Sequence, residues 1–477
     1  MAELKKKTIK GALWSFFDSF TNQGISFLVG IILARLLLPS DYGMIAMISL
    51  FIAISKIFVN SGFRSALVRK QDCTEADLNT AFVFNISVGL FFYLFLFLAA
   101  PYISIFFNQP QLTGIIRTQG ICVIFASLSL VQSVRYARNI DFKTTMKVSV
   151  ISNCFSGIVG ILLAYGGYGV WAIVYMTLTC EFVSTCLLWL FSPWKPSLFF
   201  SKGSFKYLFG YGSKLLCASL IDVLFQNINP IIIGKFFSAS SLGYFTKANT
   251  FANLPSANLN HVIQKVTFPV LSKMQDNIVT LRTNYRRIIK MTAFIVFPSM
   301  IGLAAIAKPL IIVLLTEKWN DTILLLQIIC FSMMWYPIHS LNLNLLEVKG
   351  RSDLFLRLEI IKKILYIIIV CVSVWFGVVG LCVGGVVCSL LCLVINTYYT
   401  GRLIKVGFKV QMLDILPILI NSLIMGIIVF SFSIITNNSI VSLGMGVVSG
   451  VFYYIISSYF FKFPELNECI EIIRDLF

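Results

Sequence analysis

Two lysines lie inside segments that are otherwise apolar enough to cross a membrane. Lys56 lies midway along 42–63, and Lys247 lies early in 241–264. An ionisable side chain in such a segment is costly and is by default a functional candidate that faces a cavity or a partner helix. Because an ammonium group in a low-dielectric cavity attracts an anion strongly, we assign both lysines to an anion-binding cavity. The alternative is that each lysine snorkels or pairs with a carboxylate.

Polar side chains also recur in apolar segments at spacings of three or four residues, which places them on one face of a helix. The groups are Asp18 and Asn22 in 12–36; Asp222, Gln226 and Asn229 in 211–235; and Asn249 and Asn253 in 241–264. One interpretation is the lining of a polar cavity, in which Asp18 or Asp222 couples to H+ or Na+. The other is polar contact between helices, typically worth about 0.6–2 kcal/mol each.

Three further residues are candidates for a gate or an interface. Pro230 lies within 211–235, where a proline removes a backbone hydrogen bond and can kink the helix, either as a hinge or as a static packing feature. Arg35 and Lys235 close the outer ends of the segments that contain Asp18 and Pro230. Anchoring at the membrane interface is the alternative role for these two cations.

The elements that must position these residues are long apolar segments. Of the 477 residues, 58% are hydrophobic and 12% are charged, whereas soluble domains carry roughly 25% charged residues. A membrane-crossing helix needs roughly 20 mostly apolar residues. Fourteen segments qualify: 12–36, 42–63, 80–106, 115–134, 147–165, 168–191, 211–235, 241–264, 289–313, 322–347, 358–376, 379–400, 412–435 and 440–461. The sequence therefore predicts an all-α integral membrane protein with about 14 transmembrane helices.

The net charge of +18 follows the predicted topology. In a soluble protein it would indicate a polyanionic partner such as nucleic acid. With both termini in the cytoplasm, most of the 38 lysines and arginines fall in cytoplasmic loops. The outer loops hold Arg35, Arg117, Lys235, Lys308 and Lys318. This asymmetry is typical of positive-inside membrane proteins, so we expect both termini in the cytoplasm and no nucleic-acid partner.

Two basic or amphipathic segments flank the later spans. Arg282, Arg286, Arg287 and Lys290 include i,i+4 spacings in a predicted cytoplasmic loop and either attract anionic lipid or only determine topology. The final segment, with Leu466 and Ile470 on one side, predicts an amphipathic helix on the cytoplasmic face.

An internal repeat organises the spans. The run "ARLLLPSDYG" at 34–43 matches "GKFFSASSLG" at 234–243, with Gly43 aligned to Gly243. Matches of this kind predict two six-helix lobes in the same orientation around a central cavity, as in many transporters. The predicted divisions are an N-lobe at 1–195, a C-lobe at 196–410, and two extra helices with the tail at 411–477.

The chain resembles the polysaccharide transporter family, the Wzx-type flippases of the MOP superfamily that also holds multidrug exporters and the lipid II flippase. The resembling stretches are "ARLLLPSDYGMIAMISLF", "GFRSALVRKQD", "GKFFSASSLGYFTKANTFANLP", "FPVLSKMQD" and "GGYGVWAIV". The pattern is most similar to the colanic-acid-exporter-like branch. These stretches cover both predicted lobes.

The resemblance implies a function. Such proteins move undecaprenyl-diphosphate-linked oligosaccharide units from the cytoplasmic to the periplasmic leaflet of the bacterial inner membrane by alternating access. The units later become O-antigen, capsule or exopolysaccharide. The polar lining would then hydrogen-bond sugar hydroxyls, and the partners would include membrane lipids and the polymerase and chain-length components of the same pathway.

Several function classes are disfavoured. The sequence contains no Walker A or zinc-protease pattern, so we expect no catalytic site, no metal and no cofactor apart from H+ or Na+ coupling. Two alternatives stay open. One is another exporter of the superfamily, either a lipid II flippase or a drug exporter. The other is a membrane polysaccharide polymerase, which would normally display a large periplasmic loop that this chain lacks.

Overall fold

The computed structural model describes residues 2–60, 62–436 and 438–476. Across these residues the secondary structure is helical, in the order α1 to α20 with two short 3-10 helices. Within the described part of the chain, twelve helical stretches are long and apolar enough to cross a membrane. One of them, Ser352–Ile404, contains both α16 and α17, and α11 is not among the twelve. The predicted all-α integral membrane fold is confirmed, whereas the count of 14 spans stays a prediction.

Packing divides the chain into two compact units, Met1–Gly243 and Tyr244–Phe477, which we call the N-terminal and the C-terminal unit. This division concerns packing alone. The three-part division derived from the repeat stays a prediction.

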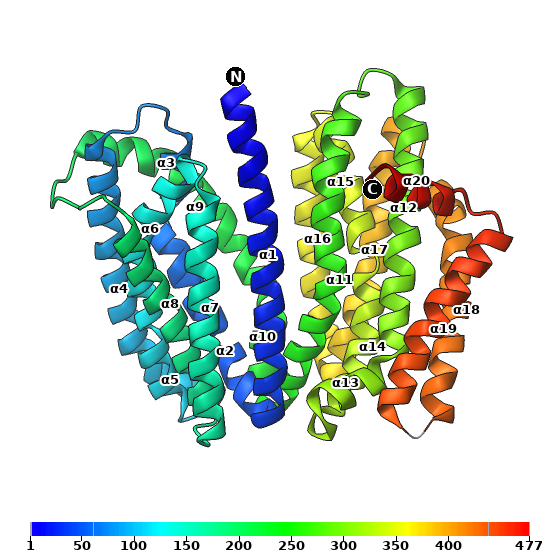
Figure 1. Ribbon diagram of the computed structural model, residues 1–477, viewed down its shortest axis with the longest axis horizontal. Helices are drawn as coiled ribbons and strands as arrows, with labels where there is room; N and C mark the ends of the chain where they lie inside the picture. Colours follow the sequence, from blue (N-terminus) through cyan, green and yellow to red (C-terminus); the bar gives the residue numbers. More distant parts are fainter. Residues whose placement is uncertain (1, 61, 437, 477) are drawn as a thin grey trace. The chain divides into compact units, whose positions relative to one another are not determined.

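In the N-terminal unit, α4 and α6 pack together, α6 packs on α8, and α8 packs on α7, which in turn lies along α1 (Figure 1). The helices are α1 (Ala2–Leu36), α2 (Pro39–Asn60), α3 (Phe63–Arg69), α4 (Glu75–Phe107), α5 (Leu112–Gln119), α6 (Ile121–Arg138), α7 (Phe142–Tyr165), α8 (Val170–Phe191), α9 (Lys202–Gln226) and α10 (Ile228–Phe236). Helix α11 (Ala239–Ser272) begins in this unit.

The start of α4 is fixed by a capping box. Thr74 accepts a hydrogen bond from the backbone N–H of Asp77, and the Asp77 carboxylate accepts one from the backbone N–H of Thr74. Lys70 reaches the same carboxylate at 2.7 Å. Two N–H groups that no helical carbonyl could satisfy are thus paired, and the negative charge lies at the positive end of the helix dipole.

Four segments expected as single helices are interrupted, and one of them, 115–134, is divided at Gly120 into α5 and α6. The segment 211–235 is divided into α9 and α10 at Asn227. Pro230 lacks the N–H that would bond the carbonyl of Gln226, so the break falls just before the proline, as its position predicts. The segment 322–347 breaks before α15, which has Pro337 in its first turn, and 289–313 breaks at Ile306.

Two glycines mark a close backbone contact. A Cβ atom on Gly43 of α2 would lie 1.8 Å from the carbonyl oxygen of Ala239, and one on Gly243 would lie 1.9 Å from the carbonyl oxygen of Pro39. The contact is reciprocal: the first turn of α2 meets the first turn of α11, and each glycine faces the other helix's first residue. Only a residue without a side chain fits at either position.

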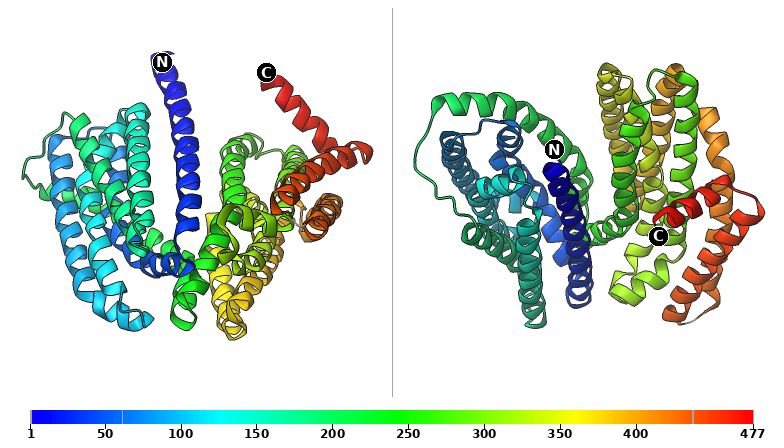
Figure 2. Two further views of the ribbon diagram at one scale, coloured as in Figure 1. Left: turned by 60° about the horizontal axis from the view of Figure 1, so that its bottom comes forward. Right: turned by 45° about the horizontal axis from the view of Figure 1, so that its top comes forward.

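The C-terminal unit contains the rest of α11 and the helices that follow. They are α12 (Ile278–Ala305), α13 (Ala307–Leu315), α14 (Asp321–Met333), α15 (Tyr336–Val348), α16 (Ser352–Ser373), α17 (Gly377–Ile404), α18 (Phe408–Ile435), α19 (Ser439–Phe460) and α20 (Pro464–Leu476). Helix α18 packs along α12 and α19, and α17 packs on α14 and α16. Helix α20 contacts α12 and α19 and lies across the ends of the longer helices (Figure 2).

A buried polar network closes the turn between α17 and α18. The side chain of Gln411 donates to Asn342 at 2.9 Å and to the carbonyl of Val406 at 3.0 Å, and Thr400 donates to Asn342 at 3.1 Å. Gln411 and Thr400 are fully buried. Because an unmade hydrogen bond is expensive in a buried site, this network fixes the path of the chain into α18.

Candidate functional site

In the N-terminal unit, Lys56 does pair with a carboxylate. Its ammonium group, on α2, donates to the Glu181 carboxylate on α8. About a third of each side chain stays exposed, 32% for Lys56 and 28% for Glu181. Sequence reasoning missed Glu181, although it is the one acidic residue in the apolar segment 168–191 and should have been singled out by the same argument as Lys56.

Asp18 and Asn22 share a face of α1, as their spacing predicts, and this face meets α7. The Asn22 amide donates to Asp18 at 2.6 Å and to Ser149 at 3.0 Å, and Asn153 donates to the Asn22 carbonyl oxygen at 2.6 Å. Ser149 also donates to Asp18. Four polar side chains thus satisfy one another across two helices, which is the arrangement expected of interhelical polar contacts.

A cavity of about 240 Å³ adjoins this cluster within the N-terminal unit. It is lined from α1, α2, α7 and α8, and its polar members are Ser26, Tyr42, Asn153, Ser156, Thr177 and Cys180. Asn153 belongs both to the cavity wall and to the cluster around Asn22. The cluster therefore reaches this cavity through Asn153.

The polar stripe on α9 and α10 is more open. Asp222 and Gln226 are exposed, and Asn229 is partly buried. The side-chain oxygen of Asn229 is buried and accepts no hydrogen bond from the described residues. Its neighbour Asn227, which sequence reasoning passed over, accepts a hydrogen bond from Ser49 of α2 at 3.4 Å. The helix break therefore places Asn227 in contact with α2.

The two cationic gate candidates, Lys235 and Arg35, differ in their surroundings. Lys235 donates to the backbone carbonyl of Phe106 at 2.6 Å and lies 4.5 Å from the centroid of that ring. It therefore holds the end of α10 against the end of α4. Arg35 is exposed at the end of α1. The roles of both residues as gates stay predictions.

In the C-terminal unit, Lys247 on α11 lies over an aromatic ring. Its Nζ is 5.9 Å from the centroid of Trp319, whose side chain is fully buried, and Tyr244 meets the same indole edge-on at 6.1 Å. An ammonium over an indole face is a cation–π contact. On the same helix, Asn253 donates to the backbone carbonyl of Asn249 at 3.0 Å, so the predicted shared face is present.

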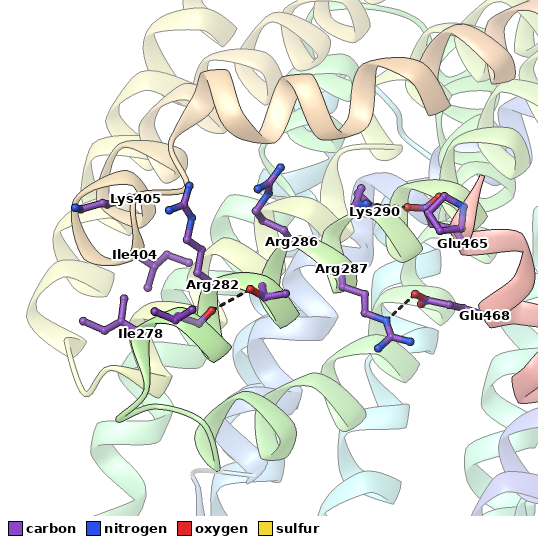
Figure 3. Close-up of a pocket in the computed structure, with 12 residues that line it drawn as sticks. Ile278, Arg282, Arg286, Arg287, Lys290, Ile404, Lys405, Glu465 and Glu468 are labelled. Atoms are coloured by element: carbon purple, nitrogen blue, oxygen red, sulfur yellow. Dashed lines mark hydrogen bonds and ion pairs between the residues drawn. The ribbon is translucent and has the colours of Figure 1, made fainter. Parts of the chain in front are cut away.

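The basic run lies on the first turns of α12 rather than in a loop. Arg286 forms two hydrogen bonds with Asp414 of α18, at 2.7 and 2.6 Å. Arg287 pairs with Glu468 at 2.7 Å and Lys290 with Glu465 at 3.2 Å, both carboxylates belonging to α20. The three cations and the two carboxylates of α20, together with Arg282 and Lys405, line a cavity of about 680 Å³ (Figure 3).

Comparison with known proteins identifies the family. The family model described as "Polysaccharide biosynthesis protein" matches residues 32–324, which is more than half of the chain. The chain belongs to this family. The resemblance drawn from its sequence is thereby confirmed.

Relatives and structures agree with this assignment. The chain is 24% identical to the teichuronic acid biosynthesis protein TuaB of Bacillus subtilis (strain 168), over 92% of this chain and 91% of that protein. It is 24% identical to the lipopolysaccharide biosynthesis protein WzxC of Escherichia coli (strain K12), over 83% of this chain and 80% of that protein. Its fold is similar to the lipid II flippase MurJ in an inward closed conformation, with a TM-score of 0.75, 16% identity, and coverage of 95% and 99%. At that identity, the likeness concerns the fold alone.

Proposed function

We propose that this membrane protein is a flippase that carries undecaprenyl-diphosphate-linked oligosaccharide units from the cytoplasmic to the periplasmic leaflet by alternating access. The single observation that carries the proposal is the pair of lysines, one in each compact unit, on helices of a chain that belongs to a polysaccharide biosynthesis family. A diphosphate is the part of such a substrate that most needs cationic partners inside a membrane.

In this proposal each lysine offers the diphosphate a cationic partner from its own unit, and the polar side chains near that lysine receive the sugar. The Glu181 carboxylate holds the ammonium group of Lys56 in place while the site is empty. Because a diphosphate offers a stronger negative charge, it displaces the Glu181 carboxylate from the ammonium group. As the partner of Lys56, Glu181 joins Asp18 and Asp222 as a candidate for ion coupling.

The test is a leaflet assay in the native host after depletion of this protein. Undecaprenyl-linked oligosaccharides are extracted, identified by mass spectrometry and tested for their exposure on either side of the inner membrane. The expected result is completed units trapped on the cytoplasmic side, with export restored by the wild-type chain. Units that reach the periplasm but stay unpolymerised would contradict the proposal and favour a polymerase.

A further inference from the structure

The strongest feature that the proposed function does not use is the cavity at the start of α12. Five cationic side chains line it: Arg282, Arg286, Arg287 and Lys290 from α12, and Lys405 from the end of α17. Figure 3 shows them along one rim, with Lys405 and Arg282 toward one end and the carboxylates of α20 toward the other. The remaining wall is apolar and includes Ile278, Val279, Ile404 and Pro464.

The charges in this cavity do not balance. Three of the cations form ion pairs with carboxylates. The pairs are Arg286 with Asp414, Arg287 with Glu468, and Lys290 with Glu465. Among the described residues, the side chains of Arg282 and Lys405 have neither an ion-pair nor a hydrogen-bond partner. Two cations on the rim of a half-enclosed cavity therefore remain to bind an anion, and a guanidinium group suits phosphate oxygens particularly well.

A second cavity gives this anion site an apolar extension. It has a volume of about 400 Å³ and lies between α11 and α12, with a lining that includes Ile263, Val270, Met291 and Ile295. Both cavities share Arg287 and Glu468 in their walls. A cationic chamber joined to an apolar groove fits an amphiphile that has a phosphate at one end and a hydrocarbon chain at the other.

We propose that these two cavities bind an anionic membrane phospholipid. Its phosphate lies between Arg282 and Lys405, and its acyl chain lies in the groove between α11 and α12. The inference requires only the membrane location of the chain and is independent of the substrate that the protein transports.

Helix α20 forms a removable wall of this site. Its two carboxylates, Glu465 and Glu468, form ion pairs with Lys290 and Arg287, which would otherwise be available to bind the phosphate. The fit at Glu465 is incomplete, since its side chain is buried and one carboxylate oxygen accepts no hydrogen bond from the described residues. A buried carboxylate oxygen without a partner is costly, so this end of α20 is the part most readily displaced by a competing anion.

The experiment measures lipid retention by the full-length chain. The protein is stripped of lipid in detergent and titrated with phosphatidylglycerol or phosphatidylcholine, and bound lipid is counted by native mass spectrometry. Replacing Arg282→Gln together with Lys405→Gln should weaken phosphatidylglycerol binding on the order of tenfold and leave phosphatidylcholine binding unchanged. The matched control is Arg402→Gln with Lys409→Gln, which removes two exposed cations that do not line the cavity.

Two further arms make the result decisive. Glu468→Gln removes a competing carboxylate, so it should strengthen phosphatidylglycerol binding several-fold. Inorganic diphosphate added as a soluble competitor should displace the lipid only weakly, because it lacks the chain that fills the groove. Equal losses in the cavity and control variants would overturn the proposal. If inorganic diphosphate displaced the lipid at the concentration at which the lipid itself half-saturates the protein, the cavity would be a site for a soluble anion and the lipid proposal would be wrong.

Discussion

The ammonium group of Lys56 has two competing partners, the Glu181 carboxylate in the empty protein and, in the proposed cycle, a diphosphate. Sequence reasoning identified the lysine because a charge in an apolar segment is conspicuous. Its partner lies 125 residues further along the chain, on another helix. Pairing across that distance depends on how α2 and α8 pack, and no local pattern encodes it.

The Lys56–Glu181 pair should behave as a coupled unit. We expect Lys56→Ala and Glu181→Gln each to lower the thermal stability of the purified protein, because each leaves the other group unpaired in a partly buried site. The double variant should recover about 1 kcal/mol relative to the sum of the two single losses, a value between those of exposed and buried pairs. Strictly additive losses would show that the two groups do not interact.

Lys247 offers a sharper test of substrate binding. Lys247→Ala removes the positive charge, whereas Lys247→Arg keeps it and still stacks on Trp319. We expect export of lipid-linked saccharide in complemented cells to fall about tenfold or more with alanine and much less with arginine. Lys265→Ala is the matched control, since Lys265 is an exposed lysine on the same helix. Wild-type export by both Lys247 variants, at normal protein levels, would remove Lys247 from the site.

At the scale of elements, the apolar segments predicted the helices well and the breaks in them poorly. The segment 322–347 meets the length and hydropathy expected of one span, yet it is divided into α14 and α15. Pro337 signals that division, and Pro230 signals the one in 211–235. Pro309 signals the break at Ile306 in the same way, because its missing N–H would bond the carbonyl of Ala305 at the end of α12.

The reciprocal contact between α2 and α11 should be intolerant of any side chain. We expect Gly43→Ala and Gly243→Ala each to reduce the yield of folded protein severely, because the added carbon would lie less than 2 Å from a backbone oxygen. Size-exclusion chromatography of fluorescently tagged protein measures that yield. Gly24→Ala is the control, since a Cβ atom there meets nothing within 4 Å and alanine favours the helix by about 1 kcal/mol. Folded, stable Gly43→Ala protein would disprove the close approach.

The repeat alignment had already paired Gly43 with Gly243, but only as matching letters. In the structure the two positions face each other's helix starts. Self-similarity in a sequence shows which residues are equivalent, whereas their mutual contact is a property of the folded chain. The lining residues follow the same pattern: their shared helical faces could be read from spacing, and their partners, such as Ser149 and Asn153, could not.

For the whole molecule, the distribution of lysine and arginine among the loops predicts which loops lie in the cytoplasm. We expect an epitope inserted at residues 196–200 to be protected in intact spheroplasts and one inserted at residues 108–111 to be accessible. The first loop joins α8 to α9 and the second joins α4 to α5, and the positive-inside rule puts them on opposite sides of the membrane. Antibody binding before and after permeabilisation measures this. Accessibility of both epitopes in intact spheroplasts would contradict the predicted alternation.

The stacking of Lys247 and Tyr244 on Trp319 also has an optical consequence. The indole is fully buried, and its emission depends on the charge and polarity immediately around it. A ligand that draws the ammonium group away would change that emission without any attached dye. With the other six tryptophans replaced by phenylalanine, Trp319 would be an intrinsic fluorophore that reports in real time whether Lys247 lies over the indole or is bound to a ligand.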